Sequence, residues 1–175
     1  MTVDGNGNSY YTGYFNGTKS FGGGALTSAT TTNAFAAKLN SDGTYGWAGQ
    51  LGRYDAIISS SASARKVALD GSGNVYVAGS FNGSLDFDAG PGDATLTSAG
   101  SNDIFIAKYD GNGSYIWAKR IGGTGSDAGI AIAVDANGNA YVTGVFAGTV
   151  DFDAGTGTSN LSIAGSATFL TKYDA

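Results

Sequence analysis

The chain has 175 residues, which is enough for one domain with a hydrophobic core. It contains no Cys and no His, so disulfides, thiol catalysis, histidine-ligated metals and imidazole acid–base chemistry are excluded within it. The formal net charge of -5 and the lack of a basic run argue against nucleic acid and against anionic membranes as partners.

The acidic residues are all Asp, and Gly occurs 30 times. Asp favours turns and caps, whereas Glu favours helix interiors. Thr, Ser, Asn, Tyr and Val are also abundant. The composition therefore predicts β-strands joined by tight turns.

A turn followed by a strand recurs three times along the chain. Asp4, Asp70 and Asp135 each open a turn that is rich in Gly and Asn, so the period is about 65 residues. Their side-chain oxygens are expected to bond their own backbone as Asx-turns rather than to bind calcium. Strands are predicted directly after these turns, at residues 9–15, 75–81 and 140–146.

Two further segments recur in the same register. One begins with Phe and contains Lys, at residues 35–40, 105–110 and 169–174, and the other has the pattern Tyr-x-Trp-Ala, at residues 45–48 and 115–118. A complete unit is therefore predicted to contain four strands. In the best-preserved part of the chain these are Gly129 to Val134, Ala140 to Phe146 and a third near Thr168 to Tyr173, with the fourth at Tyr115 to Ile121 of the preceding unit.

These units predict an all-β protein made of β-propeller blades, with about three four-stranded antiparallel repeats. The expected repeats span residues 1–63, 64–128 and 129–175. A solenoid usually has a shorter period, and a two-sheet sandwich would not explain the repetition. The first repeat has a truncated first strand, and the third repeat lacks its fourth strand. We therefore expect an excerpt of a longer array, or a protomer that completes a ring or fibre with other copies.

The residues also resemble a known family, the bacterial seven-bladed β-propeller repeat (SBBP) family. The resemblance lies in Gly129 to Gly144, in Val150 to Asp153 and in Ile104 to Asp110. It is weaker in the first repeat, where Lys38 to Asn40 and the irregular stretch from Arg53 to Ala62 depart from the pattern. The resemblance implies a secreted or surface protein of bacteria, and it implies no reaction and no catalytic residues.

Two segments between the second and third strands carry paired carboxylates. The candidate ligands are Asp86, Asp88, Asp93, Asp151 and Asp153. Alternate residues of a strand point to one face, so two such carboxylates could offer oxygens to Ca²⁺. The alternative is a solvated hairpin, with Phe87 and Phe152 turned inward and the carboxylates facing water.

Trp47 and Trp117 occupy equivalent places in the fourth strand. If the two tryptophans are exposed, they could stack on sugar rings. If they are buried, they would pack one blade against the next. Lys38, Lys108 and Lys172 recur in the third strand, where a structural pair with a carboxylate is the expected role.

The leading functional hypothesis is a non-catalytic extracellular or cell-surface scaffold, able to assemble with itself or with flanking blades, whose leader is not in this chain. A carbohydrate- or protein-binding module of lectin type is the alternative. A polysaccharide-active enzyme is a remote alternative, because a hydrolase needs two converging carboxylates. The Asn-Gly-Ser/Thr triplets that begin at Asn16, Asn82 and Asn112 match the N-glycosylation pattern and are expected to form turns.

Overall fold

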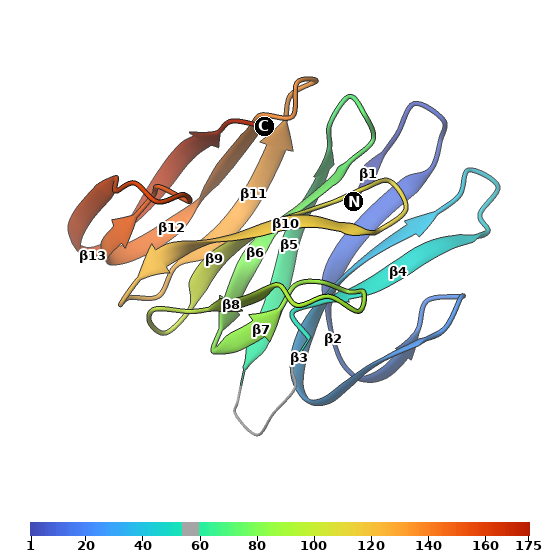
Figure 1. Ribbon diagram of the computed structural model, residues 1–175, viewed down its shortest axis with the longest axis horizontal. Helices are drawn as coiled ribbons and strands as arrows, with labels where there is room; N and C mark the ends of the chain where they lie inside the picture. Colours follow the sequence, from blue (N-terminus) through green and yellow to red (C-terminus); the bar gives the residue numbers. More distant parts are fainter. Residues whose placement is uncertain (54–59) are drawn as a thin grey trace.

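The computed structural model describes residues 1–53 and 60–175 (Figure 1). Residues 54–59, most of the irregular stretch from Arg53 to Ala62, lie outside the described residues. No helix in the described part of the chain is long and apolar enough to cross a membrane. The strands are β1 (Thr2–Val3), β2 (Ser9–Ser20), β3 (Ala25–Leu39), β4 (Tyr45–Leu51), β5 (Ser61–Leu69), β6 (Val75–Asn82), β7 (Ser84–Asp86), β8 (Thr95–Thr97), β9 (Asp103–Tyr109), β10 (Tyr115–Gly123), β11 (Ala128–Val134), β12 (Ala140–Asp151) and β13 (Asn160–Tyr173).

The strands form three antiparallel groups that lie side by side in chain order, here called blades 1, 2 and 3 (Figure 1). Blade 1 has the order β1-β2-β3-β4, blade 2 has β5-β6-β9-β10, and blade 3 has β11-β12-β13. The end of β10 also pairs with β12, so blades 2 and 3 are hydrogen-bonded to each other. The prediction of all-β propeller blades is confirmed.

The second and third strands of blade 3 are longer than the sequence indicated. β12 continues from Phe146 to Asp151, and β13 begins at Asn160 rather than near Thr168. A register shift between Ala147 and Gly148, where Gly148 has a φ of 71°, lets both strands bend and continue. In blade 2 the corresponding extension forms the separate ribbon β7–β8.

The expectation that the Asn-Gly-Ser/Thr triplets form turns is only partly confirmed. Residues 112–114 do lie in the turn between β9 and β10. The triplet that begins at Asn16, in contrast, lies inside β2 at a register shift, and Gly17 has a φ of 65°. The triplet that begins at Asn82 joins β6 to β7 at a similar glycine, Gly83. A glycine at positive φ accommodates a bend within a strand as readily as a turn, and the sequence pattern does not distinguish the two.

Two hydrophobic clusters hold the blades together, one on each face of blade 2. Along β6, Val75 and Val77 belong to the cluster shared with blade 1, whereas Tyr76 and Ala78 belong to the cluster shared with blade 3. Because successive side chains of a strand point to opposite faces, a strand covered on both faces is apolar at every position. Full burial of one such side chain contributes about 1.5–3 kcal/mol.

Each blade also contains a triad of phenylalanines. One comes from its second strand, one from the segment that links the second strand to the third, here called the excursion, and one from its third strand. In blade 2 the Phe81 and Phe87 rings are 5.4 Å apart, and the Phe87 and Phe105 rings are 4.8 Å apart. The equivalent triads are Phe15, Phe21 and Phe35 in blade 1, and Phe146, Phe152 and Phe169 in blade 3. Blade 1 therefore keeps the aromatic ring of the excursion although it lacks the paired carboxylates.

Candidate functional site

The turns between the first and second strands are closed by their own aspartates. Asp70 Oδ1 accepts hydrogen bonds from the backbone amides of Ser72 and Asn74, each at 2.9 Å, and its Oδ2 accepts one from Asn74 Nδ2 at 2.8 Å. Gly73, with a φ of 79°, completes the turn. Equivalent bonds close the turns at Asp4 and Asp135. The Asx-turn interpretation is confirmed.

The paired carboxylates of blade 2 bond the backbone of their own excursion. Asp86 Oδ1 accepts from the amides of Asp88 and Ala94, each at 2.9 Å. Asp88 Oδ1 accepts from the Gly90 amide at 2.7 Å. Asp93 caps a different turn, where its Oδ1 accepts from the amide of Thr95 at 3.0 Å.

The excursion of blade 3 repeats this arrangement. Asp151 Oδ1 accepts from the amides of Asp153 and Ser159 at 2.9 and 2.8 Å, and Asp153 Oδ1 accepts from Gly155 at 2.7 Å. These bonds hold the pKa of Asp151 below its usual value, because they stabilise the ionised carboxylate. Both excursions thus use the first oxygen of each carboxylate to shape the loop.

The phenylalanine between the two carboxylates is buried in both excursions, as expected for Phe87 and Phe152. A tyrosine at the end of the third strand fixes it: Tyr109 Oη donates to the Phe87 carbonyl at 2.8 Å, and Tyr173 Oη donates to the Phe152 carbonyl at 3.0 Å. Burial raises the pKa of Tyr173 to about 12, so its hydroxyl remains a donor. Blade 1, which lacks the paired carboxylates, has Leu39 in place of this tyrosine.

Among the described residues, no group of three or more Asp side chains converges as a metal cage. Asp86 Oδ2 lies 3.9 Å from Arg53 Nη2, a partial neutralisation by a cation of the chain itself. Calcium binding by the excursions stays a prediction.

Trp47 contacts the next blade. Its Nε1 donates to the Gly111 carbonyl of blade 2 at 3.0 Å, and its ring lies 6.5 Å from that of Tyr10. Trp117 lies 5.9 Å from Tyr76 and has Lys119 Nζ 5.5 Å above its ring. Both tryptophans are half-buried and pack against the hydrophobic clusters between blades.

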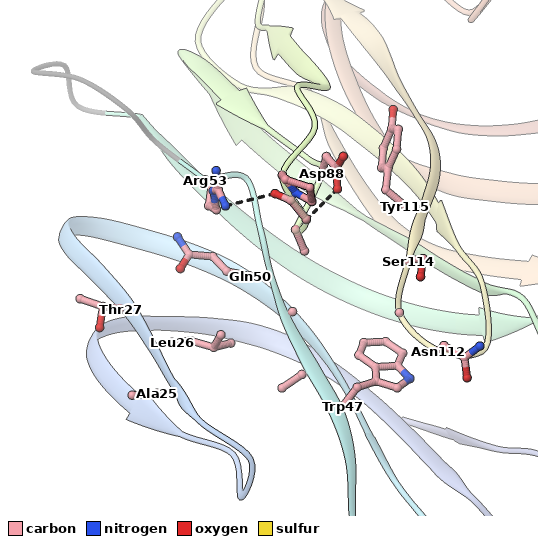
Figure 2. A pocket seen from close by; sticks show the side chains of 16 residues that line it. Ala25, Leu26, Thr27, Trp47, Gln50, Arg53, Asp88, Asn112, Ser114 and Tyr115 are labelled. Carbon is pink, nitrogen blue, oxygen red and sulfur yellow. Dashed lines mark hydrogen bonds between the residues drawn. The ribbon is translucent and has the colours of Figure 1, made fainter.

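A groove of about 590 Å³ lies where blades 1 and 2 meet, and Trp47 forms one end of it (Figure 2). Arg53 and the Asp88 excursion line its opposite end, where Arg53 Nη1 donates to the Gly90 carbonyl at 3.3 Å. Gln50, Asn112 and Tyr115 also line the groove. Asp88 is the one carboxylate among the groove residues that the structure describes, whereas a glycosidase uses two.

The groove differs between blades although the fold repeats. Gly49 lies in its floor, and a Cβ placed on Gly49 would be 3.2 Å from the Ala89 methyl group. The equivalent residue in the next blade is Lys119, which covers the ring of Trp117. The Trp47 ring has no such cover from that position.

The recurring lysines of the third strand do pair with carboxylates or rings, although not with one set of partners. Lys108 Nζ lies 3.6 Å from Asp70 Oδ2 and 4.8 Å from the centre of the Tyr76 ring. Lys172 Nζ lies 2.6 Å from Asp174 Oδ1.

Two structural roles were not found from the sequence. The hydroxyls of Tyr45 and Tyr115 accept the backbone amides of Ala48 and Ala118, at 2.9 and 2.8 Å, beside register shifts in the ladder. The second is an ion pair between Arg120 Nη1 and the fully buried Asp103 Oδ2, at 2.7 Å. Comparison of the repeats could have indicated this ion pair, because both charged residues are replaced together in blade 1. Gln50 stands there in place of Arg120, and Asn33 in place of Asp103.

A family model, described as a beta-propeller repeat of the SBBP type, matches residues 46–86 and 116–145. These two segments match SBBP β-propeller repeats. Each match begins in the fourth strand of one blade and ends in the second strand, or just after it, in the next blade. The SBBP unit therefore includes the contact between neighbouring blades, and the resemblance identified from the sequence is confirmed.

An uncharacterized WD repeat-containing protein of Acanthamoeba polyphaga mimivirus is 30% identical to this chain over 122 residues. The similarity covers 62% of this chain and 8% of the relative. The chain thus spans a small part of the length of that protein.

Proposed function

We propose that this chain is a non-catalytic scaffold segment, located outside the cell or on its surface, that holds other parts in place through stacked blades. The observation that carries the proposal is the role of the recurring polar side chains, which bond the protein itself. Trp47 bonds the next blade at Gly111, Tyr76 bonds the next blade at Gly138, and Tyr109 bonds its own excursion.

The enzymatic alternative finds less support. Catalysis needs groups that converge on one substrate and whose pKa values are matched to proton transfer. In the groove between blades 1 and 2 the carboxylate of Asp88 bonds the Gly90 amide, and the groove includes no second carboxylate among its described residues.

Antibodies raised against residues 1–175 test the scaffold proposal in cells of the source. Immunogold electron microscopy is expected to label the cell surface or extracellular material. Label confined to the cell interior would overturn the extracellular part of the proposal. The same images show whether the labelled material forms arrays or fibres.

The second candidate function is carbohydrate binding in the groove of Figure 2. It is favoured by an aromatic ring, Trp47, in a groove that is also lined by the side chains of Gln50 and Asn112, because sugars require both stacking and hydrogen bonding. A glycan array identifies ligands, and Gln50→Ala is expected to weaken a hit at least tenfold. Lys119→Ala, at the equivalent of Gly49 in the next blade, is the control and is expected to leave binding unchanged.

A further inference from the structure

Blade 3 exposes a sheet face whose counterparts are covered inside the chain. Tyr76 and Ile106 of blade 2 are 0% exposed, because blade 3 lies on them. The equivalent residues of blade 3, Tyr141 and Leu170, are 39% and 77% exposed. Leu170 and Tyr141 lie on the same face, because they alternate with the buried Phe169 and Val142 of β13 and β12.

The structure also shows what covers such a face. Tyr76 Oη donates to the Gly138 carbonyl, in the first turn of blade 3, at 3.0 Å. Ile106 shares a cluster with Ile132 and Phe146, on the first two strands of blade 3. The cover is therefore the first two strands of a following blade, together with the turn that joins them.

Blade 1 presents such a covering surface at the opposite end of the molecule. Met1 is 74% exposed, whereas its equivalent in blade 2, Val67, is 1% exposed. Tyr11 and Phe35, whose rings are 5.8 Å apart, are half-buried, although their equivalents in blade 2 are fully covered by blade 1. Beside them lies an open cavity of about 370 Å³ lined by Phe15, Phe21 and Phe35 with Tyr14 and polar neighbours.

We propose that blade 3 of one chain binds blade 1 of a second copy, head to tail, with Tyr141 and Leu170 packed against Tyr11 and Phe35. The contact continues the blade-to-blade packing seen twice within the chain, so it requires no new kind of surface. It rests on the proposed scaffold function and names the partner of that scaffold.

The two surfaces are different, so the association is heterologous and yields either a closed ring or an open filament. A ring of two copies would hold six blades, which lies within the range of about 4–8 that propellers have.

Sedimentation of the full chain over a concentration series tests the association. The wild type is expected to shift from monomer to a dimer or a longer polymer as its concentration rises. Leu170→Asp places a charge in the proposed contact and is expected to weaken association at least tenfold, because burying an unpaired carboxylate is costly. Ile116→Asp is the matched control, since Ile116 is 44% exposed on the fourth strand of blade 2, away from both end faces.

Crosslinking tests the geometry, since the chain has no native Cys. Within the chain, a Cβ placed on Gly71 would lie 2.8 Å from the Ala136 carbonyl, so the first turns of blades 2 and 3 touch. If the contact between copies repeats the junction of blades 2 and 3, it places Ala136 next to Gly5 of the second copy. Both residues are exposed, and a side chain at Gly5 has open space.

A short bismaleimide is expected to link the Gly5→Cys chain to the Ala136→Cys chain when the two are mixed, and to link neither variant to itself. A monomer that persists at about 100 μM, which is well above micromolar dissociation constants, would overturn the proposal. Association without the mixed crosslink would overturn the head-to-tail contact and leave the scaffold function standing. Immunogold label confined to the cell interior would overturn the extracellular part of the proposed function whatever the crosslinking shows.

Discussion

A single hydroxyl group fixes each carboxylate-bearing excursion to its blade. Tyr109 is 1% exposed, and its hydroxyl bonds the carbonyl of Phe87, which is itself fully buried. Burial raises the pKa of Tyr109 well above its usual value, so the group stays a donor throughout the physiological range. The bond matters because a buried carbonyl that loses its partner has no water to replace it.

Tyr109→Phe is therefore expected to lower the free energy of unfolding by about 1–3 kcal/mol, the cost of leaving a buried acceptor unpaired. Urea denaturation measures this as a lower midpoint with an unchanged slope. Tyr14→Phe is the control: this tyrosine is 63% exposed, and the change is expected to cost less than about 0.5 kcal/mol. Equal midpoints for the two variants would contradict the role given to Tyr109.

The turn aspartates make stability depend on acid. For Asp70, burial raises the pKa. The hydrogen bonds from Asn74 and Ser72 and the charge of Lys108 lower it by more than burial raises it, so the pKa is below the ordinary value of 3.8. A lowered pKa in the folded state stabilises the fold above pH 3.8, and this contribution is lost as the pH falls through the folded pKa. Asp4 and Asp135 shift in the same direction.

Asp70→Asn should therefore lower the melting temperature at pH 7 more than at pH 3. Below pH 3.8 the ionised carboxylate no longer contributes its full stability, so the difference between wild type and variant narrows. Thermal melts at the two pH values check this. A difference between wild type and variant that is the same at both would show that the charged form has no special role in the turn.

At the scale of elements, the excursions show why small residues follow the paired carboxylates. A Cβ on Gly157 would collide with Asp153 Oδ2, and one on Gly92 would collide with Asp88 Oδ2. The chain thus wraps closely around a carboxylate whose other oxygen accepts a backbone amide. The glycine is required by close approach, since neither Gly92 nor Gly157 has a positive φ.

Gly157→Ala is expected to destabilise the protein by about 0.5–1.5 kcal/mol, because the exposed Asp153 side chain must turn away from the new methyl group and lose its hydrogen bond from the Gly155 amide. The double variant Gly157→Ala with Asp153→Ala should cost less than the sum of the two single changes, because the clash disappears with the carboxylate. Gly5→Ala, where nothing lies within 4 Å, is the control. Strict additivity in the denaturation curves would contradict the proposed clash.

The calcium prediction for the excursions is tested by the same melts. If Asp86 and Asp88 bind Ca²⁺ through the oxygens that bond no amide, about 5 mM Ca²⁺ should raise the melting temperature, because extracellular sites bind at about 10⁻⁴–10⁻³ M. Asp88→Asn should reduce that shift. An unchanged melting temperature in the wild type would remove calcium from the account of these loops.

At the scale of the whole molecule, repetition made the architecture predictable. Val75, Tyr76 and Val77 form a continuous apolar run after a closed turn, and this pattern predicts a strand buried on both faces. The period of about 65 residues predicts that the equivalent strands lie in equivalent sheets. The turn aspartates were also predictable, because their partners lie within four residues of them.

The remaining features join residues that are far apart in sequence or depend on irregular backbone. The bond from Tyr109 to Phe87 spans the whole excursion, and no local pattern indicates it. The role of Tyr115 requires a register shift in the ladder before its hydroxyl can meet the Ala118 amide. The groove at Trp47 requires the angle at which two blades meet, which the sequence of either blade does not contain.

The stacking of blades makes stability a sum of blades and contacts, and this gives the last prediction. In repeat proteins each unit gains stability from its neighbours, so equivalent residues differ in importance by whether a neighbour is present. Ile106 is covered by a neighbouring blade within the chain and is 0% exposed, whereas its equivalent Leu170 is 77% exposed. Ile106→Ala is expected to cost about 2–5 kcal/mol at any protein concentration, because it leaves a cavity between blades 2 and 3.

Leu170→Ala should cost less than about 0.5 kcal/mol in dilute solution, as an exposed substitution does. Its cost should grow with protein concentration if a second copy covers the face, because association stabilises the wild type by mass action. Thermal melts at about 1 and 100 μM separate the two cases for a Kd in the micromolar range. A Leu170→Ala penalty that is large at both concentrations would mean that the face is covered within the single chain, contrary to the exposure of Leu170.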